Sequence, residues 1–334
     1  FKLNEIGKSG ISKLTLFIEN SENKIIGTIT DGDIRRAILT HKNLDFKIKD
    51  ICNSDFIYEI ESDGYIDLYR ARNKGIFLLP ILTKTNKISR IIDLKRTKSL
   101  LPLECVIMAG GRGKRLSPLT DKIPKPLLSL GKTTIIEQNI DKLISFGIKK
   151  FYITINYLGN LIKDKLGDGS DKGISIKYIE EDKPLGTAGS ISKINQINSP
   201  NIILINADIL SNIDYHSMYK LFVDTNSKMT VASFEYKYDI PYAVLENKNN
   251  IVSAFKEKPT MLYSTNAGIY MLSKSLINMI PKNKFFDITD LMELLIKHKI
   301  KLNNYNLKGY WIDIGKPIDY EKAKEFYNYI SSKD

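Results

Sequence analysis

Cysteine, histidine and tryptophan are scarce in this chain of 334 residues, which contains two cysteines, three histidines and one tryptophan. Cys52 and Cys105 stand far apart in apolar surroundings, so they form neither a disulfide framework nor a metal-binding pair. His41, His216 and His298 are isolated, and none belongs to a motif. The sequence therefore argues against a disulfide-stabilised secreted domain and against histidine metal sites, and we expect a cytoplasmic protein.

Long hydrophobic runs are also missing. The longest, such as Gly75–Leu82 and Ile202–Leu210, are much shorter than the stretch of about 20 residues that spans a bilayer. No signal peptide precedes the first predicted strand, so we expect no membrane partner. The chain opens at Phe1 without a methionine, and we expect that residues before it have been removed or are not included in this sequence. After a final helix at Tyr320–Ile330 we expect no appended acetyltransferase domain.

Positive charge is in excess, because 50 Lys and Arg outnumber 38 Asp and Glu and leave a net charge of +12. Such a charge often indicates nucleic-acid binding. Here the lysines are scattered, and the chain has no helix-turn-helix, zinc-finger spacing or aromatic RNA-binding motif. We therefore expect small anions, such as nucleotides and sugar phosphates, and no nucleic acid.

The length predicts two domains. From Glu104 onward, strands and helices alternate, which is typical of a parallel α/β sheet. The expected strands are Cys105–Ala109, Lys150–Ile155, Ile174–Ile179 and Ile202–Asn206, and the expected helices are Ile135–Phe146, Leu158–Leu166, Ala188–Ile194 and Asp214–Asp224. After Lys228 the pattern becomes antiparallel, with expected turns at Asn247–Asn250 and Thr260–Met261.

A glycine-rich, cationic loop follows the first of these strands. Residues 110–115 read Gly-Gly-Arg-Gly-Lys-Arg, and Lys125 lies between two prolines. Glycine lets backbone N–H groups approach a ligand closely, and successive N–H groups form a concavity suited to phosphate oxygens. A Walker A loop is excluded because Arg115 follows Lys114, and the dinucleotide fingerprint is excluded because Leu116 stands at its third small position. The loop therefore predicts a polyphosphate site.

Ala109 to Pro126 resembles the signature of the sugar nucleotidyltransferases, Ala-Gly-Gly-x-Gly-x-Arg-Leu-x-Pro-Leu-Thr ending in Pro-Lys-Pro. Four further segments resemble motifs of this family in the expected order. In chain order they are the Pro-Leu-Gly-Thr-Ala-Gly segment from Pro184, the strand ending at Asp208, the Glu-Lys-Pro segment with the Asn-x-Gly segment at Glu257–Gly268, and Trp-Ile-Asp-Ile-Gly at Trp311–Gly315. The resemblance implies an α/β fold, a Rossmann-like mixed-sheet (GT-A-like) nucleotidyltransferase domain over residues 104–334.

The resemblance also implies roles for individual residues. The catalytic residues would be Arg115, Lys125, Asp208 and Asp313, with Asp208 and Asp313 binding Mg²⁺. The nucleotide would contact Ala109, Gly110, Gly111, Gly113, Lys114, Arg115, Pro184, Gly186, Thr187 and Asp208. The sugar phosphate would contact Lys125, Glu257, Lys258, Asn266 and Gly268. Two of these residues have a simpler alternative, because Asp208 and Thr187 could each serve only as a helix cap.

The N-terminal region resembles a pair of CBS domains. Expected strands at Leu14–Ile18 and Lys24–Thr30 and a helix at Asp33–Leu39 form the first repeat, and a helix at Tyr65–Asn73 with strands at Gly75–Leu82 and Ile88–Leu94 forms the second. Gly27–Arg36 resembles the closing CBS signature, in which Thr30 and Asp33 contact a nucleotide. A hydroxyl and a carboxylate at this spacing can equally cap the helix. We therefore predict a smaller α+β CBS pair at 1–95, with its first repeat truncated, and a linker at 96–103.

These patterns lead to one main functional hypothesis and two alternatives. The main hypothesis is a Mg²⁺-dependent nucleotidyltransferase joining GTP and glucosamine-1-phosphate, similar to the CBS-fused guanylyltransferases of legionaminic acid biosynthesis and regulated by a nucleotide at the CBS pair. Mannose-1-phosphate, or another NTP, is the first alternative. A nucleotide-sensing regulatory protein without catalysis is the second. Because CBS pairs commonly associate, we expect a homo-oligomer.

Overall fold

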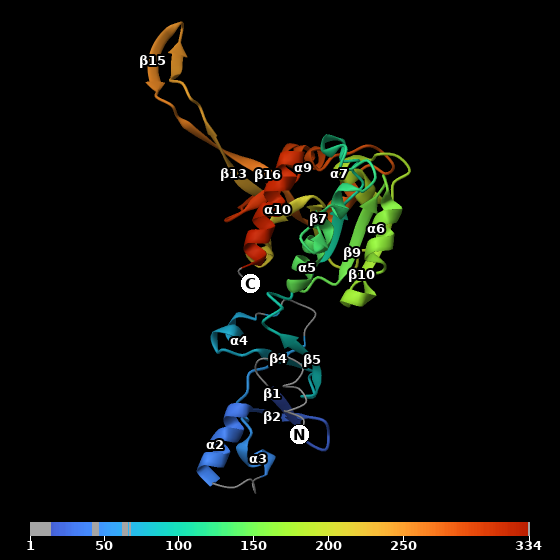
Figure 1. The fold of residues 1–334 in the computed structure, drawn as a ribbon, viewed down its shortest axis with the longest axis vertical. Helices are drawn as coiled ribbons and strands as arrows, with labels where there is room; N and C mark the ends of the chain where they lie inside the picture. The colour runs from blue at the N-terminus through green and yellow to red at the C-terminus, as the bar shows by residue number, and fades with distance from the viewer. Residues whose placement is uncertain (1–14, 42–46, 62–65, 67, 333–334) are drawn as a thin grey trace. The chain divides into compact units, whose positions relative to one another are not determined.

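The structure is a computed structural model that describes residues 15–41, 47–61, 66 and 68–332 (Figure 1). It divides into two compact units, of which unit 1 holds residues 1–101 with 145–147 and unit 2 holds residues 102–144 with 148–334. Within the described part of the chain, no helix combines the length and the apolarity needed to cross a bilayer.

Unit 1 contains small sheets and short helices. Its elements are β1 (Thr15–Glu19), β2 (Ile25–Thr30), α2 (Asp31–His41), α3 (Ile48–Ile51), β3 (Glu59–Ile60), α4 (Tyr69–Asn73), β4 (Leu78–Leu82) and β5 (Ile88–Asp93). β1 and β2 are antiparallel, whereas β4 pairs with β3 in parallel and with β5 antiparallel. Leu79 and Ile81 of β4 are fully buried in the core that β4 shares with β5 and α4.

Two predicted elements of unit 1 are shorter in the structure. The helix expected at Tyr65–Asn73 is described only as α4, because Ile66 instead forms an isolated bridge with Leu100. The strand expected from Gly75 begins at Leu78, since Gly75 adopts a positive φ of 68° that an extended strand does not contain. Leu14, the first residue of another expected strand, lies outside the described residues.

Unit 2 is built on a seven-stranded mixed sheet in the order β10-β9-β6-β11-β16-β13-β17. The strands are β6 (Glu104–Met108), β9 (Lys150–Ile155), β10 (Ser175–Glu180), β11 (Asn201–Asn206), β13 (Met229–Asp239), β16 (Thr260–Ser273) and β17 (Leu302–Asn306). β10, β9, β6 and β11 run parallel, as the sequence predicts, and β16 is antiparallel to both β11 and β13. Each of the strands β6, β9, β10 and β11 starts within one residue of its predicted first residue.

Helices and short strands complete unit 2. The helices are α5 (Ile135–Ser145), α6 (Gly159–Leu166), α7 (Gly186–Gly189), α8 (Tyr215–Asp224), α9 (Ile288–Lys297) and α10 (Pro317–Ser331), joined by 3₁₀ turns η1 (Lys114–Leu116), η2 (Lys125–Leu127), η3 (Ser170–Lys172), η4 (Ser190–Lys193) and η5 (Lys274–Met279). The short strands are β7 (Ser129–Leu130), β8 (Thr133–Thr134), β12 (Ile209–Ser211) and β18 (Trp311–Asp313). Leu291 and Leu295 of α9 pack in one buried cluster with Leu204 and Tyr270 of the sheet.

One predicted helix of unit 2 is wrong. In place of a helix at Ala188–Ile194 the chain forms α7 and then η4, and Ile194 has extended backbone. Glycine and serine favour helix poorly, so tertiary contacts decide this segment. The backbone N–H groups of Ala188 and Gly189 both donate to the carbonyl of Phe286 at 2.9 Å.

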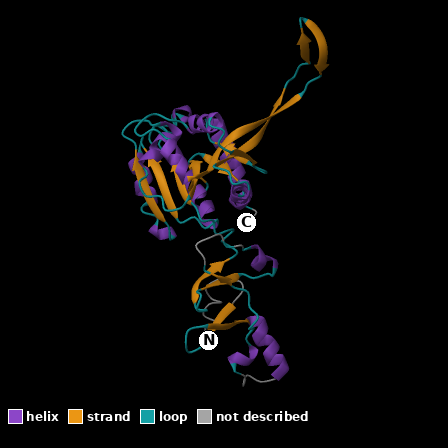
Figure 2. Ribbon diagram, turned by 180° about the vertical axis from the view of Figure 1, so that it is seen from behind, coloured by secondary structure: helices purple, strands orange, loops and turns teal. Residues whose placement is uncertain are grey.

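β13 and β16 extend beyond the sheet as a two-stranded ribbon that ends in the hairpin of β14 (Val244–Lys248) and β15 (Ile251–Lys256) (Figures 1 and 2). The predicted turn at Asn247–Asn250 is confirmed, with positive φ at Asn249 and Asn250. The predicted turn at Thr260–Met261 is wrong, because both residues pair with the end of β13. Ten apolar residues of the ribbon and hairpin are exposed: Tyr236, Tyr238, Tyr242, Leu245, Ile251, Val252, Phe255, Met261, Leu262 and Tyr263.

Candidate active site

The ends of two neighbouring parallel strands position the site. Asn206, the last residue of β11, pairs with Met108, the last residue of β6. The glycine-rich loop and Asp208 therefore leave the same edge of the sheet, the carboxyl edge at which open α/β sheets bind ligands. Asp208 remains close to this edge because Ala207 N–H donates to the carbonyl of Met108 at 3.2 Å.

Gly113 controls the shape of the loop. Its φ of +64° lies in the left-handed region, and a Cβ there would come within 3.2 Å of Lys125 Cβ and 3.3 Å of Thr120 Cγ2. The Thr120 hydroxyl donates to the carbonyl of Gly113 at 2.9 Å. A side chain at position 113 would thus strain the backbone and push the loop away from Lys125.

Lys125 lies between two carboxylates from distant parts of the chain. Its ammonium donates a hydrogen bond to Asp208 Oδ2 and lies 3.9 Å from Asp313 Oδ1. Its side chain is only 10% exposed, which makes this lysine a fixed charge rather than a mobile surface group. Asp313 reaches the cluster because β18 pairs with β12, so that Asp313 is opposite Ile209.

The two carboxylates are incompletely compensated. Burial raises the pKa of Asp313, and the nearby carboxylate of Asp208 raises it further, against the opposing effect of Lys125 and Arg115. Asp208 Oδ1 is buried and has no hydrogen-bond partner in the described structure. An orphaned carboxylate oxygen beside a second carboxylate fits a hard cation, since Mg²⁺ usually takes one or two carboxylates together with phosphate oxygens and water. The described residues contain no group of three or more His, Cys, Asp or Glu that could hold a metal.

A cavity of about 260 Å³ opens beside this cluster. It is lined by Gly111, Gly113, Lys114, Arg115, Lys125, Asp208 and Gly315. Six of these seven are residues that the sequence pointed to, and Gly315 is the one it missed. A Cβ on Gly315 would lie 3.4 Å from Asp313 Oδ2 and 3.7 Å from an Arg115 guanidinium nitrogen, which are ordinary contact distances, so Gly315 lies directly beside both side chains.

The predicted base-binding segment lies beside the glycine-rich loop. Pro184 is exposed. Gly186 has a φ of +76°, and a Cβ there would come within 2.8 Å of the carbonyl oxygen of Phe286. The Thr187 hydroxyl donates to Asp287 at 3.0 Å and accepts from Ile288 N–H at 2.9 Å, so it takes part in capping α9. The capping alternative is thus observed for Thr187, and its contact with a base remains a prediction.

Glu181 lies three residues before Pro184 and borders the glycine-rich loop. A Cβ at Gly110 would come within 2.8 Å of Glu181 Oε1, so the first glycine of the loop lies directly against this carboxylate. Burial raises the pKa of Glu181, although Leu185 N–H donates to its Oε2 at 3.2 Å. Ala109, just before the loop, is 2% exposed and donates its N–H to the carbonyl of Thr154.

The predicted sugar-binding residues separate into two groups. Asn266 and Gly268 lie on the base of β16, where a Cβ on Gly268 would collide with the amide of Asn206, two residues before Asp208. Glu257 and Lys258 lie on the exposed link between β15 and β16, at the outer end of the ribbon. The structure therefore does not bring these two residues to the cluster of their own chain.

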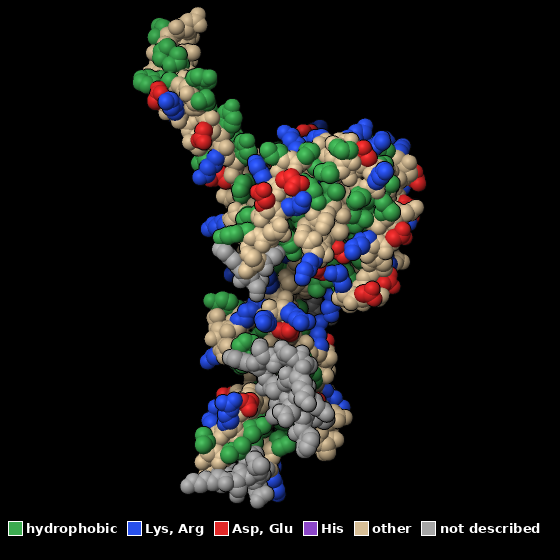
Figure 3. Space-filling view, viewed as in Figure 1, with side chains coloured by type: hydrophobic (Ala, Val, Ile, Leu, Met, Phe, Trp, Pro, Cys, Tyr) green, Lys and Arg blue, Asp and Glu red, His purple; other side chains and the backbone are tan. Residues whose placement is uncertain are grey.

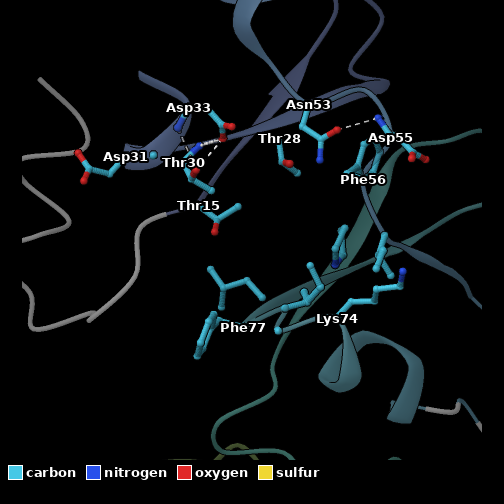
Figure 4. A pocket seen from close by; sticks show the side chains of 16 residues that line it. Thr15, Thr28, Thr30, Asp31, Asp33, Asn53, Asp55, Phe56, Lys74 and Phe77 are labelled. Atoms are coloured by element: carbon cyan, nitrogen blue, oxygen red, sulfur yellow. Dashed lines mark hydrogen bonds between the residues drawn. The ribbon is translucent and has the colours of Figure 1, made fainter. Parts of the chain in front are cut away.

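Thr30 and Asp33 line a different cavity, of about 710 Å³, in unit 1 (Figure 4). The N–H and the hydroxyl of Thr30 donate to Asp33 Oδ2 at 2.7 and 2.6 Å, and Asp33 N–H donates to the Thr30 hydroxyl at 3.3 Å. Burial alone would raise the pKa of Asp33, but these hydrogen bonds and Arg36 lower it. The two residues therefore cap α2 and face the cavity at the same time.

The mixed sheet, the glycine-rich loop at its carboxyl edge and the Lys125–Asp208–Asp313 cluster define a phosphate-binding α/β protein. The chain belongs to the nucleotidyl transferase family, whose model matches residues 104–329. It is 29% identical to a mannose-1-phosphate guanyltransferase of Kluyveromyces lactis over 69% of this chain. This chain spans only 66% of that relative's length.

Solved structures agree with this family. The chain is similar to HddC from Yersinia pseudotuberculosis, with a TM-score of 0.54, 29% identity and coverage of 67% of this chain and 99% of that chain. A second structure of HddC, complexed with GMP-PN, gives a TM-score of 0.53 at 28% identity, with the same coverage of both chains. The predicted mixed α/β nucleotidyltransferase fold is confirmed.

Proposed function

We propose that unit 2 is a Mg²⁺-dependent sugar-1-phosphate guanylyltransferase, which joins GTP and a sugar-1-phosphate to give a GDP-sugar and pyrophosphate. The observation that carries this proposal is Lys125 between Asp208 and Asp313 at the carboxyl edge of the sheet, beside the cations of the glycine-rich loop. This arrangement supplies fixed positive charge, a carboxylate pair for a hard cation and N–H groups for phosphate oxygens.

In the reaction, a phosphate oxygen of the sugar-1-phosphate attacks the α-phosphorus of GTP. A new oxygen–phosphorus bond forms, the bond from the α-phosphorus to its bridging oxygen breaks, and pyrophosphate leaves with the electron pair. Arg115 and Lys114, which line the cavity with Lys125, would bind the leaving pyrophosphate, and Lys125 would neutralise charge on the reacting phosphates. Asp208 and Asp313 would hold Mg²⁺, which would supply positive charge for the triphosphate. The protein then acts mainly by holding two anions in line.

The substrates are proposed from the relatives and from the resemblance. The GMP-PN complex of HddC and the naming of the fungal relative as a guanyltransferase support GTP. The name of that relative supports mannose-1-phosphate, whereas the resemblance to CBS-fused enzymes supports glucosamine-1-phosphate. We propose glucosamine-1-phosphate first and mannose-1-phosphate as the alternative.

Pyrophosphate release over a matrix of four NTPs and several sugar-1-phosphates, with and without Mg²⁺, tests the proposal. We expect release with GTP and one sugar-1-phosphate, and none after chelation of the metal. Release that prefers UTP or CTP would contradict the guanylyl assignment. No release with any pair would contradict the catalytic assignment and would favour a regulatory protein.

We further propose that residues 1–95 form a CBS pair that binds a regulatory nucleotide. The cavity in unit 1 supports this, because Thr30 and Asp33 lie on its wall together with Thr28, Asn53 and Lys74. Its volume is within the range of about 300–1,000 Å³ of small-molecule sites. Thermal unfolding with adenine and guanine nucleotides tests the proposal by comparing the wild type with Asp33→Ala, which alters the cavity of unit 1 and leaves the glycine-rich loop of unit 2 unchanged. We expect one nucleotide to raise the Tm of the wild type by more than that of the variant; equal shifts in both, or no shift with any nucleotide, would refute the regulatory site.

A further inference from the structure

Arg112 is the one cation of the glycine-rich loop that the proposed reaction does not use. Figure 3 shows Lys and Arg spread over one face of the molecule and interspersed with Asp and Glu, whereas this loop carries Arg112, Lys114 and Arg115 within four residues. Lys114 and Arg115 line the active-site cavity together with Gly111 and Gly113. Arg112 lies between those two glycines in the sequence but is not among the described residues that line the cavity. Its side chain therefore serves a different contact.

Arg112 stacks on Tyr157. The central carbon of its guanidinium lies 5.1 Å from the centroid of the Tyr157 ring, within the about 6 Å at which an aromatic face attracts a cation. Tyr157 belongs to the turn that follows β9. This turn leaves the same edge of the sheet as the loop, because Thr154 of β9 pairs with Met108 of β6 in parallel. The contact thus joins the loop to the end of a neighbouring strand.

Tyr157 also holds the far end of the segment that begins with Arg112. Its hydroxyl donates a hydrogen bond to the carbonyl of Asp121 at 2.9 Å. Between these two contacts the segment is closed by backbone hydrogen bonds of its own and by the Ser117 hydroxyl, which donates to Asp121 Oδ1 at 2.9 Å. One tyrosine thus contacts both ends of residues 112–121.

The backbone beside Tyr157 is strained. Leu158 has a φ of +52°, in the left-handed region that residues other than glycine seldom adopt. Such conformations persist only where the surrounding structure holds them, and they cluster at functional sites. On the other side of Tyr157, the Asn156 amide donates to the carbonyl of Glu181 at 2.6 Å, just before the predicted base-binding segment. The turn at residues 156–158 therefore contacts both segments that are expected to bind the nucleotide.

We propose that Tyr157 is a positioning residue of the nucleotide site. By holding Arg112 and the carbonyl of Asp121, it keeps the glycine-rich loop in the shape that presents its N–H groups, Lys114 and Arg115 to a triphosphate. A loop that is ordered before binding lowers the entropy cost of binding. Arg112 then acts on the loop rather than on the phosphates. The inference rests on the proposed function for the identity of the ligand, and the contact itself is independent of it.

Hydrogen exchange of the free protein tests the contact without any substrate. Tyr157→Ala removes both the ring and the hydroxyl, so we expect the backbone amides of residues 112–121 to exchange about tenfold faster, since a cation–π contact and a hydrogen bond each change an equilibrium severalfold. Tyr178→Phe is the matched control, because the Tyr178 hydroxyl donates to the carbonyl of Gly167 at 2.6 Å, after α6 and outside the site. It should leave the exchange of residues 112–121 unchanged.

Equal exchange in the wild type and in Tyr157→Ala would overturn the proposal. Should Tyr157→Ala fail to fold, Tyr157→Phe and Arg112→Ala repeat the test, because each removes one of the two contacts. Each should then speed the exchange of residues 112–121 by about threefold.

Kinetics distinguish a positioning role from a direct contact between Arg112 and GTP. We expect Tyr157→Ala to raise the KM for GTP about tenfold while kcat and the KM for the sugar-1-phosphate stay within about twofold, because fewer molecules then hold the loop in its binding shape. Arg112→Ala should raise the KM for GTP about threefold. The double variant should match Tyr157→Ala, since the stacking partner of Arg112 is already gone. A double variant whose increase is the product of the two single increases would mean that Arg112 binds GTP itself, and would overturn the proposal.

The outcomes separate this inference from the proposed function. Faster exchange in Tyr157→Ala with an unchanged KM for GTP would overturn the positioning role and leave the guanylyltransferase assignment intact. A wild type inactive with every substrate pair would overturn the proposed function, and hydrogen exchange would still decide whether Tyr157 holds the loop.

Discussion

The acidic clusters of the two units differ in how their carboxylates are satisfied. In unit 1, Asp33 accepts two hydrogen bonds from Thr30 and pairs with Arg36 within one turn of the chain. In unit 2, Asp208 and Asp313 share one lysine, and Asp208 Oδ1 has no partner in the described structure. The pKa of Asp33 is lowered, whereas burial and a neighbouring carboxylate raise the pKa of Asp313.

This difference separates a local structural motif from a site that needs a ligand. Thr30 and Arg36, both close to Asp33 in the sequence, provide hydrogen bonds and an ion pair to its carboxylate. Asp33 therefore stabilises α2 whether or not a nucleotide binds. The carboxylates of unit 2 come from distant segments, and burial beside Asp208 raises the pKa of Asp313, so ionised Asp313 is destabilising where it stands. Substitutions in the two clusters should accordingly separate activity from stability.

Asp208→Asn should have the largest effect. It removes one of two carboxylates for the metal and the hydrogen-bond partner of Lys125, so we expect more than the about 10²–10³-fold loss of kcat that follows removal of one electrostatic group. Pyrophosphate release measures this loss. Asp224→Asn, an exposed position on α8, is the control and should keep wild-type activity. Near wild-type rates in Asp208→Asn would contradict the metal assignment.

Lys125→Met should reduce kcat by about 10²–10³-fold, because it removes the fixed charge beside the reacting phosphates. Met keeps the length of the buried side chain, so the loop should retain its contact with Gly113. Lys122→Met, on the exposed part of the same segment, should change kcat little. Equal losses in the two variants would show that Lys125 acts only through net charge.

Asp33→Ala should destabilise unit 1 by about 1 kcal/mol, the usual size of a capping interaction, because Asp33 is the third residue of α2 and accepts the hydrogen bonds of Thr30 in its cap. Urea unfolding followed by hydrogen exchange in β2 and α2 measures the change. The control is Asp31→Ala, which loses only an exposed pair with Arg35 and should cost a few tenths of a kcal/mol. Equal costs would contradict the capping role, and neither variant should alter transfer activity without a regulatory nucleotide.

Asp313→Asn should have the smallest effect on stability, and it should raise the stability of the fold rather than lower it. The pKa of Asp313 is higher in the folded than in the unfolded chain, so the ionised carboxylate destabilises the fold above its raised pKa. This destabilisation disappears as the pH falls to the ordinary value of 3.8. We therefore expect a Tm above that of the wild type at pH 8, a gap that closes towards pH 4, and loss of activity. A lower Tm at pH 8 would mean that the contact with Lys125 outweighs burial.

Local patterns predicted much of the fold. Apolar runs such as Lys150–Ile155 become strands at the expected positions, since burial on both faces demands continuous apolar sequence. The segment from Ala188 and the strand start at Thr260 were wrong, because the contact with Phe286 and the register against β13 decide them. Gly315 was missed as a site residue, since only its position beside Asp313 and Arg115 distinguishes it.

The sequence by itself determined the glycine-rich loop, the strand that precedes it and the residues available for phosphate and metal. Those features depend on local backbone freedom and on side-chain chemistry, which neighbours in sequence specify. Tertiary structure alone decided that Asp208 and Asp313 share Lys125, and that Glu257 and Lys258 lie on a ribbon away from that cluster. Both depend on the pairing of strands far apart in the chain, β12 with β18 and β13 with β16.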